Sequence, residues 1–204
     1  MNIDMIPLIS FVIVTTFTPG PNNISSASMG VMYGYKGTFN YLIGIASGFF
    51  FVMIACAYLS SAMLAIIPVA ERYLRWVGAG YILWLAIGIL HSDYSISESN
   101  EVAKAFTKGF ILQLFNPKVA VYGLVLYSTF LTAISSRLGY LSLSAVTFTF
   151  TAFVATSTWA LFGAAIKKKL KNNSFRKIIN TSLSVLLIYT AIELSGILSW
   201  FGNS

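Results

Sequence analysis

The chain has few charged residues, few acids, one histidine and one cysteine, and each shortage narrows what it can be. Only 9% of its 204 residues are charged, whereas a soluble domain carries about 25%. Because Cys56 has no second cysteine, an intrachain disulfide is excluded, and we interpret it as a small apolar side chain. One His, one Cys and six acids offer no convincing ligand or nucleophile set, so we predict no metal, no cofactor and no enzyme.

Hydrophobic residues make up 57% of the sequence, and the mean hydropathy is +0.78. These values predict an all-α polytopic membrane protein, with the lipid bilayer around a single transmembrane domain, residues 1–204. No soluble catalytic domain fits beside the spans, and no phosphate-binding Gly-rich loop that would indicate ATP use is present. The first apolar run follows Asp4 rather than basic residues, so we expect a mature span rather than a cleaved signal peptide.

Six apolar stretches approach the roughly 20 residues that a helix needs to cross a bilayer core of about 30 Å. They cover about 5–33, 39–66, 73–90, 106–133, 138–166 and 178–201. A polar loop, 91–103, separates a first three-helix half (1–90) from a second (104–204). Because three spans per half is an odd number, the halves enter from opposite sides, and we expect a 3+3 inverted repeat.

The basic residues predict the orientation. Loops after the first, third and fifth spans carry nine of them: Lys36, Lys104, Lys108, Lys167, Lys168, Lys169, Lys171, Arg176 and Lys177. The alternate loops carry only Arg72, Arg75 and Arg137. Because positively charged loops stay in the cytoplasm, we expect both termini outside and the polar loop 91–103 inside. Topology therefore explains the net charge of +7 better than a nucleic-acid partner does.

Proline interrupts two of the apolar stretches at matching places in the two halves. The interruptions are Thr18-Pro19-Gly20-Pro21-Asn22-Asn23 and Phe115-Asn116-Pro117-Lys118. Proline lacks a backbone donor and clashes with the preceding turn, so each site should break its helix, the first and the fourth. Broken helices within a bilayer line protected cavities, and a matched pair of them indicates a transporter's binding site. A plain kink that serves packing is the alternative for the first interruption.

These motifs, the turn at 34–37 (GYKG) and residues 77–84 (VGAGYILW) in the third expected span resemble the LysE/RhtB family of bacterial amino-acid exporters. Residues 42–68 and 81–87 are most similar to its cysteine/O-acetylserine exporter branch. The resemblance implies efflux of a small amino acid or derivative across the bacterial inner membrane. Many members of the family carry an acid where this chain has Phe49.

The interruptions supply the candidate substrate-binding residues. A helix N-terminus near Pro21 offers backbone N–H groups to a substrate carboxylate, Gly20 permits close approach, and the start of a helix near Pro117 offers a similar end. The predicted set is Pro19, Gly20, Pro21, Asn22, Asn23, Asn116, Pro117, Lys118 and Glu193.

Two charged candidates have alternatives. Lys118 either faces a cavity, where it could hold a carboxylate, or reaches lipid headgroups if the fourth span begins at Pro117. Glu193 either pairs with Lys118, binds the substrate ammonium or carries a proton, or it leans outward at the interface. We expect a secondary carrier that is driven by an ion gradient, with protons as the coupling ion. A homo-oligomer is compatible with this function. The alternative functions are a membrane channel, an assembly subunit without active transport, or an intramembrane enzyme.

Gly30 and Gly34, and Gly44 and Gly48, are spaced four apart. Small residues at this spacing let membrane helices approach closely. We interpret all four glycines as packing positions.

Overall fold

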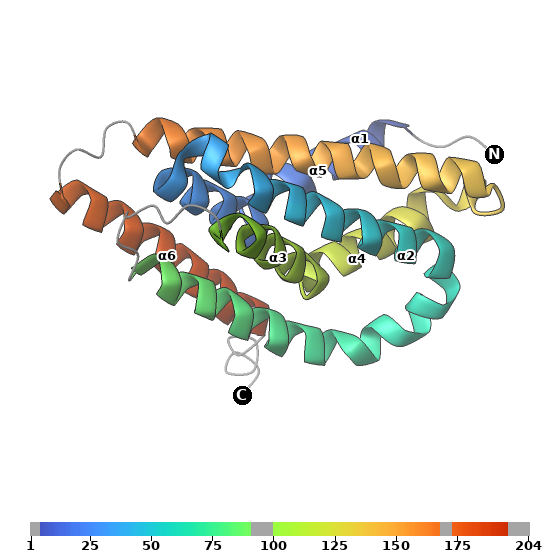
Figure 1. Cartoon of the computed structure of the whole chain (residues 1–204). Coiled ribbons are helices and arrows are strands. Elements are labelled where there is room, and N and C mark those ends of the chain that lie inside the picture. Colours follow the sequence, from blue (N-terminus) through green and yellow to red (C-terminus); the bar gives the residue numbers. More distant parts are fainter. Residues whose placement is uncertain (1–4, 91–99, 168–172, 196–204) are drawn as a thin grey trace.

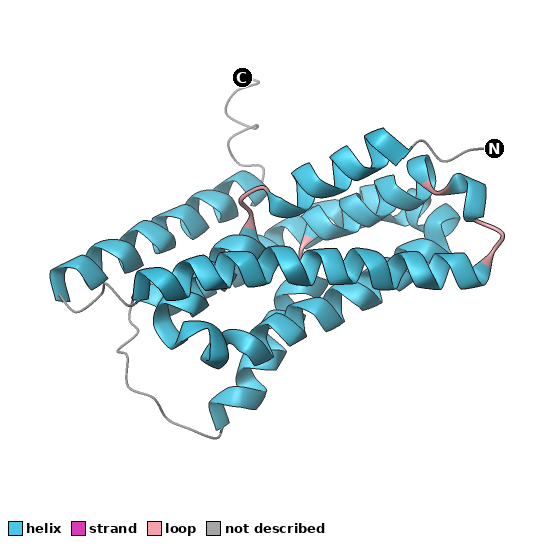
Figure 2. Cartoon of the chain, turned by 90° about the horizontal axis from the view of Figure 1, so that it is seen from above, coloured by secondary structure: helices cyan, strands magenta, loops and turns pink. Residues whose placement is uncertain are grey.

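A computed structural model describes residues 5–90, 100–167 and 173–195 of the chain. Its elements are α1 (Met5–Phe17), α2 (Pro21–Leu90), α3 (Asn100–Leu114), α4 (Pro117–Val125), the π-helix η1 (Leu126–Phe130), the 3₁₀ helix η2 (Thr132–Ile134), α5 (Leu138–Lys167) and α6 (Asn173–Ser195). Figure 2 shows helices joined by short loops and no strand within this described part. The all-α prediction is confirmed.

Helix α2 is continuous over 70 residues but reverses direction (Figure 1). We call residues 21–33 its first arm, 38–58 its second arm and 73–90 its third arm. The first reversal is at Gly34, whose φ of 70° is a backbone conformation that glycine adopts without steric cost. The first two arms then lie together, since the Tyr41 hydroxyl donates to Ser25 Oγ over 2.8 Å. Gly34 is therefore a turn residue, which agrees with the turn expected at 34–37 and corrects its interpretation as a packing position.

The region of the fourth expected span is divided. Helix α3 ends at Leu114, α4 begins at Pro117, and their axes differ by 56°. Asn116 is extended and caps α4 with its side chain, while Pro117 occupies the first helical position, where its missing N–H costs nothing. Helix α3 begins at Asn100, so residues 100–103 are helical and the expected loop 91–103 extended too far. The physical reason is that asparagine favours a helix N-terminus.

Few described helices are long and apolar enough to cross a membrane alone. Two stretches are, Pro21–Tyr58 and Leu138–Ile166, and the bent pair Lys104–Leu114 and Pro117–Phe130 makes a third if it counts as one span. Met5–Phe17 and Lys177–Ile192 are apolar but shorter. Among the described helices, two stretches, or three with the bent pair, therefore reach crossing length, where the sequence predicts six spans.

Glycine allows the arms of α2 to approach other helices closely (Figure 1). A Cβ added at Gly30 would overlap the Ala160 carbonyl of α5, and one at Gly163 of α5 would overlap the carbonyl of Ala27. Gly44 of the second arm meets the backbone of α3 in the same way. These contacts support the packing interpretation of Gly30 and Gly44.

The third arm of α2 packs against α6. Ser184 of α6 donates to the carbonyl of Ala86 over 3.1 Å. Ile82 and Ala86 belong to the same buried cluster as Leu187 and Ala191 of α6. This places α6 away from α5 in Figure 1, with the first two arms of α2, α3 and α4 between them.

We predict that Gly30→Ala destabilises the protein by about 1–3 kcal/mol, because the new methyl group must displace the α5 backbone. Gly80→Ala is the matched control, since a Cβ there meets nothing within 4 Å and alanine favours the helix. Thermal unfolding of the purified variants in detergent compares them. Equal melting temperatures for the two variants would contradict close packing at Gly30.

Candidate functional site

The two proline interruptions meet through a chain of side-chain amides. Asn116 Nδ2 donates to Asn22 Oδ1 over 3.1 Å, and Asn22 Nδ2 donates to Gln113 Oε1 over 2.5 Å. Asn116 Oδ1 in turn accepts from the backbone N–H of Lys118 over 3.1 Å. The start of α2 is therefore tied to the end of α3 and the start of α4, about ninety residues further along the chain.

Prolines 19 and 21 deprive two carbonyls of α1 of their helical partners. In a continuous helix the N–H of residue 19 would bond the carbonyl of Thr15, and that of residue 21 the carbonyl of Phe17. Trp159 of α5 replaces the second donor, since its Nε1 donates to the Phe17 carbonyl over 3.3 Å. The interruption thus leaves the Thr15 carbonyl without its helical donor.

Asn23 caps the same end of α1. Its Nδ2 donates to the carbonyls of Thr16 and Thr18, each over 2.9 Å. Asn23 itself is 4% exposed, so the donor of both bonds is buried, while the Thr16 and Thr18 residues that accept them are half-buried and exposed. Asn23 therefore acts from the next helix as a C-terminal cap of α1.

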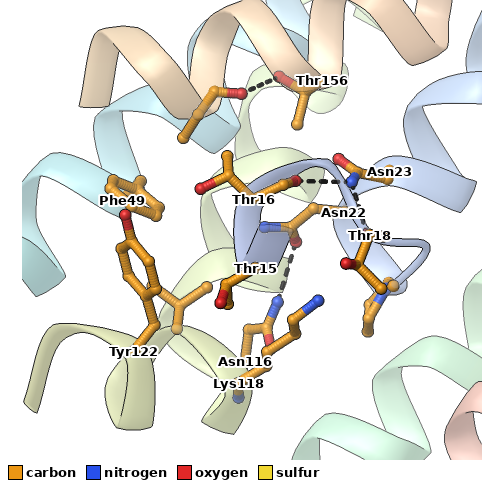
Figure 3. Close-up of a pocket in the computed structure, with 14 residues that line it drawn as sticks. Thr15, Thr16, Thr18, Asn22, Asn23, Phe49, Asn116, Lys118, Tyr122 and Thr156 are labelled. Carbon is orange, nitrogen blue, oxygen red and sulfur yellow. Dashed lines mark hydrogen bonds between the residues drawn. The ribbon is translucent and has the colours of Figure 1, made fainter. Parts of the chain in front are cut away.

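A cavity of about 50 Å³ lies where the two interruptions meet (Figure 3). That volume holds a few water molecules. Its lining comes from the end of α1, the first two arms of α2, α4 and α5. The lining residues are Thr15, Thr16, Thr18, Gly20, Pro21, Asn22, Asn23, Phe49, Asn116, Lys118, Val119, Tyr122, Ala152 and Thr156.

Most of the predicted site residues are brought together at this cavity. Those that line it are Gly20, Pro21, Asn22, Asn23, Asn116 and Lys118. Pro19 is exposed, and Pro117 is buried at the start of α4 outside the lining. Glu193 belongs to α6, but its side chain lies outside the described residues.

Lys118 points toward the first interruption. A Cβ built on Gly20 would lie 3.2 Å from Lys118 Nζ and 3.7 Å from its Cδ. The side chain also lies beside Thr18 and Asn22 in Figure 3. This geometry supports the cavity-facing interpretation of Lys118 over the headgroup alternative. A side chain larger than glycine at position 20 would push the ammonium group aside.

The N-terminus of α4 is capped by its own chain. Pro117 has no N–H, Lys118 donates to the Asn116 side chain, and Val119 and Ala120 donate to the Asn116 carbonyl over 3.0 and 3.3 Å. The first-turn donors are therefore engaged, which corrects the expectation that α4 offers an anion the same end as α2.

The N-terminus of α2 is more open. Gly20 precedes it and has no side chain to cap it, Pro21 has no N–H, and Ile24 donates to the Gly20 carbonyl over 2.9 Å. The N–H groups of Asn22 and Asn23 remain as the first-turn donors, and their residues line the cavity. A negative group is therefore favoured at α2 rather than at α4.

Sequence reasoning missed several residues of the site. Gln113 is fully buried and packs its Cβ against Gly48 of the second arm, where a Cβ would come within 2.8 Å of it. Its place in an apolar run just before Asn116 was the available signal. Nothing comparable identified Thr16 or Thr156, because α5 and the end of α1 meet only in the folded chain.

A helical membrane protein in which two interrupted helices face one cavity, lined in part by asparagines, threonines and a lysine, has the architecture of a membrane transporter. The sequence pattern of the LysE type translocators matches residues 13–196, and the chain belongs to that family. A protein of Salmonella choleraesuis (strain SC-B67) named cysteine/O-acetylserine efflux protein is 30% identical over 185 residues, which cover 91% of this chain and 94% of the relative. One of the same name from Escherichia coli O139:H28 (strain E24377A / ETEC) is 31% identical over the same shares. No solved structure matches the chain.

We predict that Asn23→Ala lowers the free energy of unfolding by about 1–3 kcal/mol, because it leaves the carbonyls of Thr16 and Thr18 without this donor. Asn23→Asp should be at least as damaging, since a carboxylate would face the same carbonyls without donating. Thr147→Ala, an exposed residue bonded only within its own helix, is the control and should stay within about 0.5 kcal/mol of wild type. Equal melting temperatures of Asn23→Ala and Thr147→Ala in detergent would contradict the capping role of Asn23.

Proposed function

We propose that the protein is a secondary carrier that exports a small amino acid, of the cysteine or O-acetylserine kind, across the bacterial inner membrane. The family and the names of the two relatives support amino-acid efflux. The proposal includes six spans in a 3+3 inverted repeat, both termini on the periplasmic side, and coupling to protons. The paired interruptions and the nine basic residues of alternate loops support that topology.

The observation that carries the proposal is the meeting of two opposite helix poles at the cavity. Helix α1 ends at Phe17 and α2 begins at Pro21, so the negative pole of one lies next to the positive pole of the other. An amino acid is a zwitterion with one charge for each pole. Each pole contributes about 0.3–1 kcal/mol when exposed and up to about 2 kcal/mol when partly buried.

The substrate carboxylate would lie at the N-terminus of α2. The N–H groups of Asn22 and Asn23 are available there, and Lys118 Nζ lies beside Gly20. Hydrogen bonds to charged groups are about twice as strong as neutral ones. A lysine is costly at membrane depth, and a carboxylate ligand would offset part of that cost.

The substrate ammonium would lie at the end of α1. The Thr15 carbonyl has no helical donor because residue 19 is proline, and Thr15 and Thr16 both line the cavity. No acidic residue is among the described lining residues, and Phe49 occupies the wall from the second arm of α2. Carbonyl and hydroxyl oxygens would therefore hold the ammonium, and Glu193 remains a candidate proton carrier.

We predict that Lys118→Gln lowers amino-acid transport at least about tenfold, equivalent to about 1.4 kcal/mol, while Lys118→Arg retains part of it. Inside-out vesicles with an imposed proton gradient and labelled cysteine or O-acetylserine provide the measurement. Lys177→Gln, which changes an exposed lysine of α6, controls for charge and abundance.

Wild-type flux in Lys118→Gln would remove Lys118 from the site. A wild-type transport rate that does not change with the proton gradient would contradict the coupling to protons. A wild-type protein that moves none of a panel of labelled amino acids would contradict the proposed function as a whole.

A further inference from the structure

The Tyr122 hydroxyl is a buried polar group with no hydrogen-bond partner. It is one of four such side-chain atoms in the described part of the chain, with Ser26 Oγ, Gln113 Nε2 and Thr149 Oγ1. Tyr122 is 4% exposed and is the member of this group that lines the cavity. The Thr16 side chain is close enough to interact with this hydroxyl, although the pair does not meet the geometry of a hydrogen bond. A buried donor left unpaired costs about 1–3 kcal/mol.

Aromatic contacts hold the Tyr122 ring in place. Phe11 of α1 stacks on it at 5.6 Å between ring centroids, with an interplanar angle of 9°. Phe49 lies at 5.9 Å and Phe148 of α5 at 6.5 Å. With neighbours from three other helices, the ring has little freedom to turn its hydroxyl toward another partner. The unpaired donor is therefore a fixed feature of the cavity.

Tyr122 and Lys118 mark two ends of the cavity. They lie four residues apart on α4, hence on one face and about 6 Å apart along the helix axis. Figure 3 shows Tyr122 with Phe49 on one side, and Lys118 with Thr18 and Asn22 on the other. An amino acid whose carboxylate lies at Lys118 and the start of α2 would extend its side chain toward Tyr122.

We propose that Tyr122 is a specificity-determining residue that donates a hydrogen bond to the side chain of the substrate. The matching substrates carry a small side chain with an acceptor atom, which is the sulfur of a thiol, the oxygen of a hydroxyl or the carbonyl oxygen of an ester. An apolar side chain of the same size leaves the buried hydroxyl unpaired and is rejected. This inference rests on the proposed function and assigns its side-chain subsite.

The test compares cysteine with 2-aminobutyrate, which replaces the thiol by a methyl group of similar size. Their inhibition constants against labelled substrate are measured in inside-out vesicles of wild type and Tyr122→Phe. Wild type should prefer cysteine, and Tyr122→Phe should reduce that preference about tenfold by weakening cysteine while 2-aminobutyrate binds as before. Serine against alanine gives a second pair with the same expectation.

Tyr127→Phe is the matched control. Tyr127 is also a buried tyrosine of this segment, but its hydroxyl is bonded to Ser144 Oγ over 3.0 Å and it does not line the cavity. Its loss should lower the melting temperature and leave the cysteine preference unchanged. Tyr122→Phe, by contrast, should melt no lower than wild type without substrate, because it removes an unpaired buried hydroxyl.

Several results would overturn the inference. They are equal preference in wild type and Tyr122→Phe, an equal loss of preference in both tyrosine variants, absence of any preference in wild type, and a Tyr122→Phe protein that is destabilised or fails to fold without substrate. Each of these requires that wild type transports an amino acid. Absence of all transport in wild type would instead contradict the proposed function.

Discussion

Backbone groups freed by proline within apolar surroundings are the constraint on which this structure depends. Each unpaired group in such surroundings costs several kcal/mol, since no bulk water is present to bond it. Pro19 and Pro21 free the carbonyls of Thr15 and Phe17, and side chains from other elements cap this end of α1. Trp159 of α5 and Asn23 of α2 donate to this end of α1. The interruption is thus stable only because distant segments pack around it.

The same constraint explains why the two interruptions differ in what they can bind. Asn116 is a residue with a capping side chain, and it engages the donors at the start of α4. Gly20 stands at the corresponding place before α2 and leaves donors open beside the Lys118 ammonium group. A single difference in capping residue therefore makes one helix N-terminus structural and the other suitable for an anion. The adjacent end of α1 adds the opposite pole within the same cavity.

Local rules apply at the interruptions, because proline acts on its own helix wherever the chain folds. Helix α1 ends at Phe17, before Pro19, and α3 ends at Leu114, before Pro117. Local rules also predicted close approach at Gly30 and Gly44, where spacing alone identifies a packing face. Gly34 was expected both in the turn at 34–37 and as a packing position, and its positive φ agrees with the turn. The contacts of Tyr122 with Phe11 and of Trp159 with the Phe17 carbonyl could not be predicted, because only the tertiary fold creates them.

The chain of amides from Asn116 through Asn22 to Gln113 links the two halves of the site energetically. Separation of the interruptions would break two hydrogen bonds between buried or half-buried groups, at about 1–3 kcal/mol for each group left unpaired. A ligand lowers that cost only if it supplies replacement donors and acceptors as the interruptions part. A zwitterion has both, whereas an apolar solute has neither. The capping that makes the interruptions stable therefore also favours rearrangement with a polar ligand over rearrangement when empty.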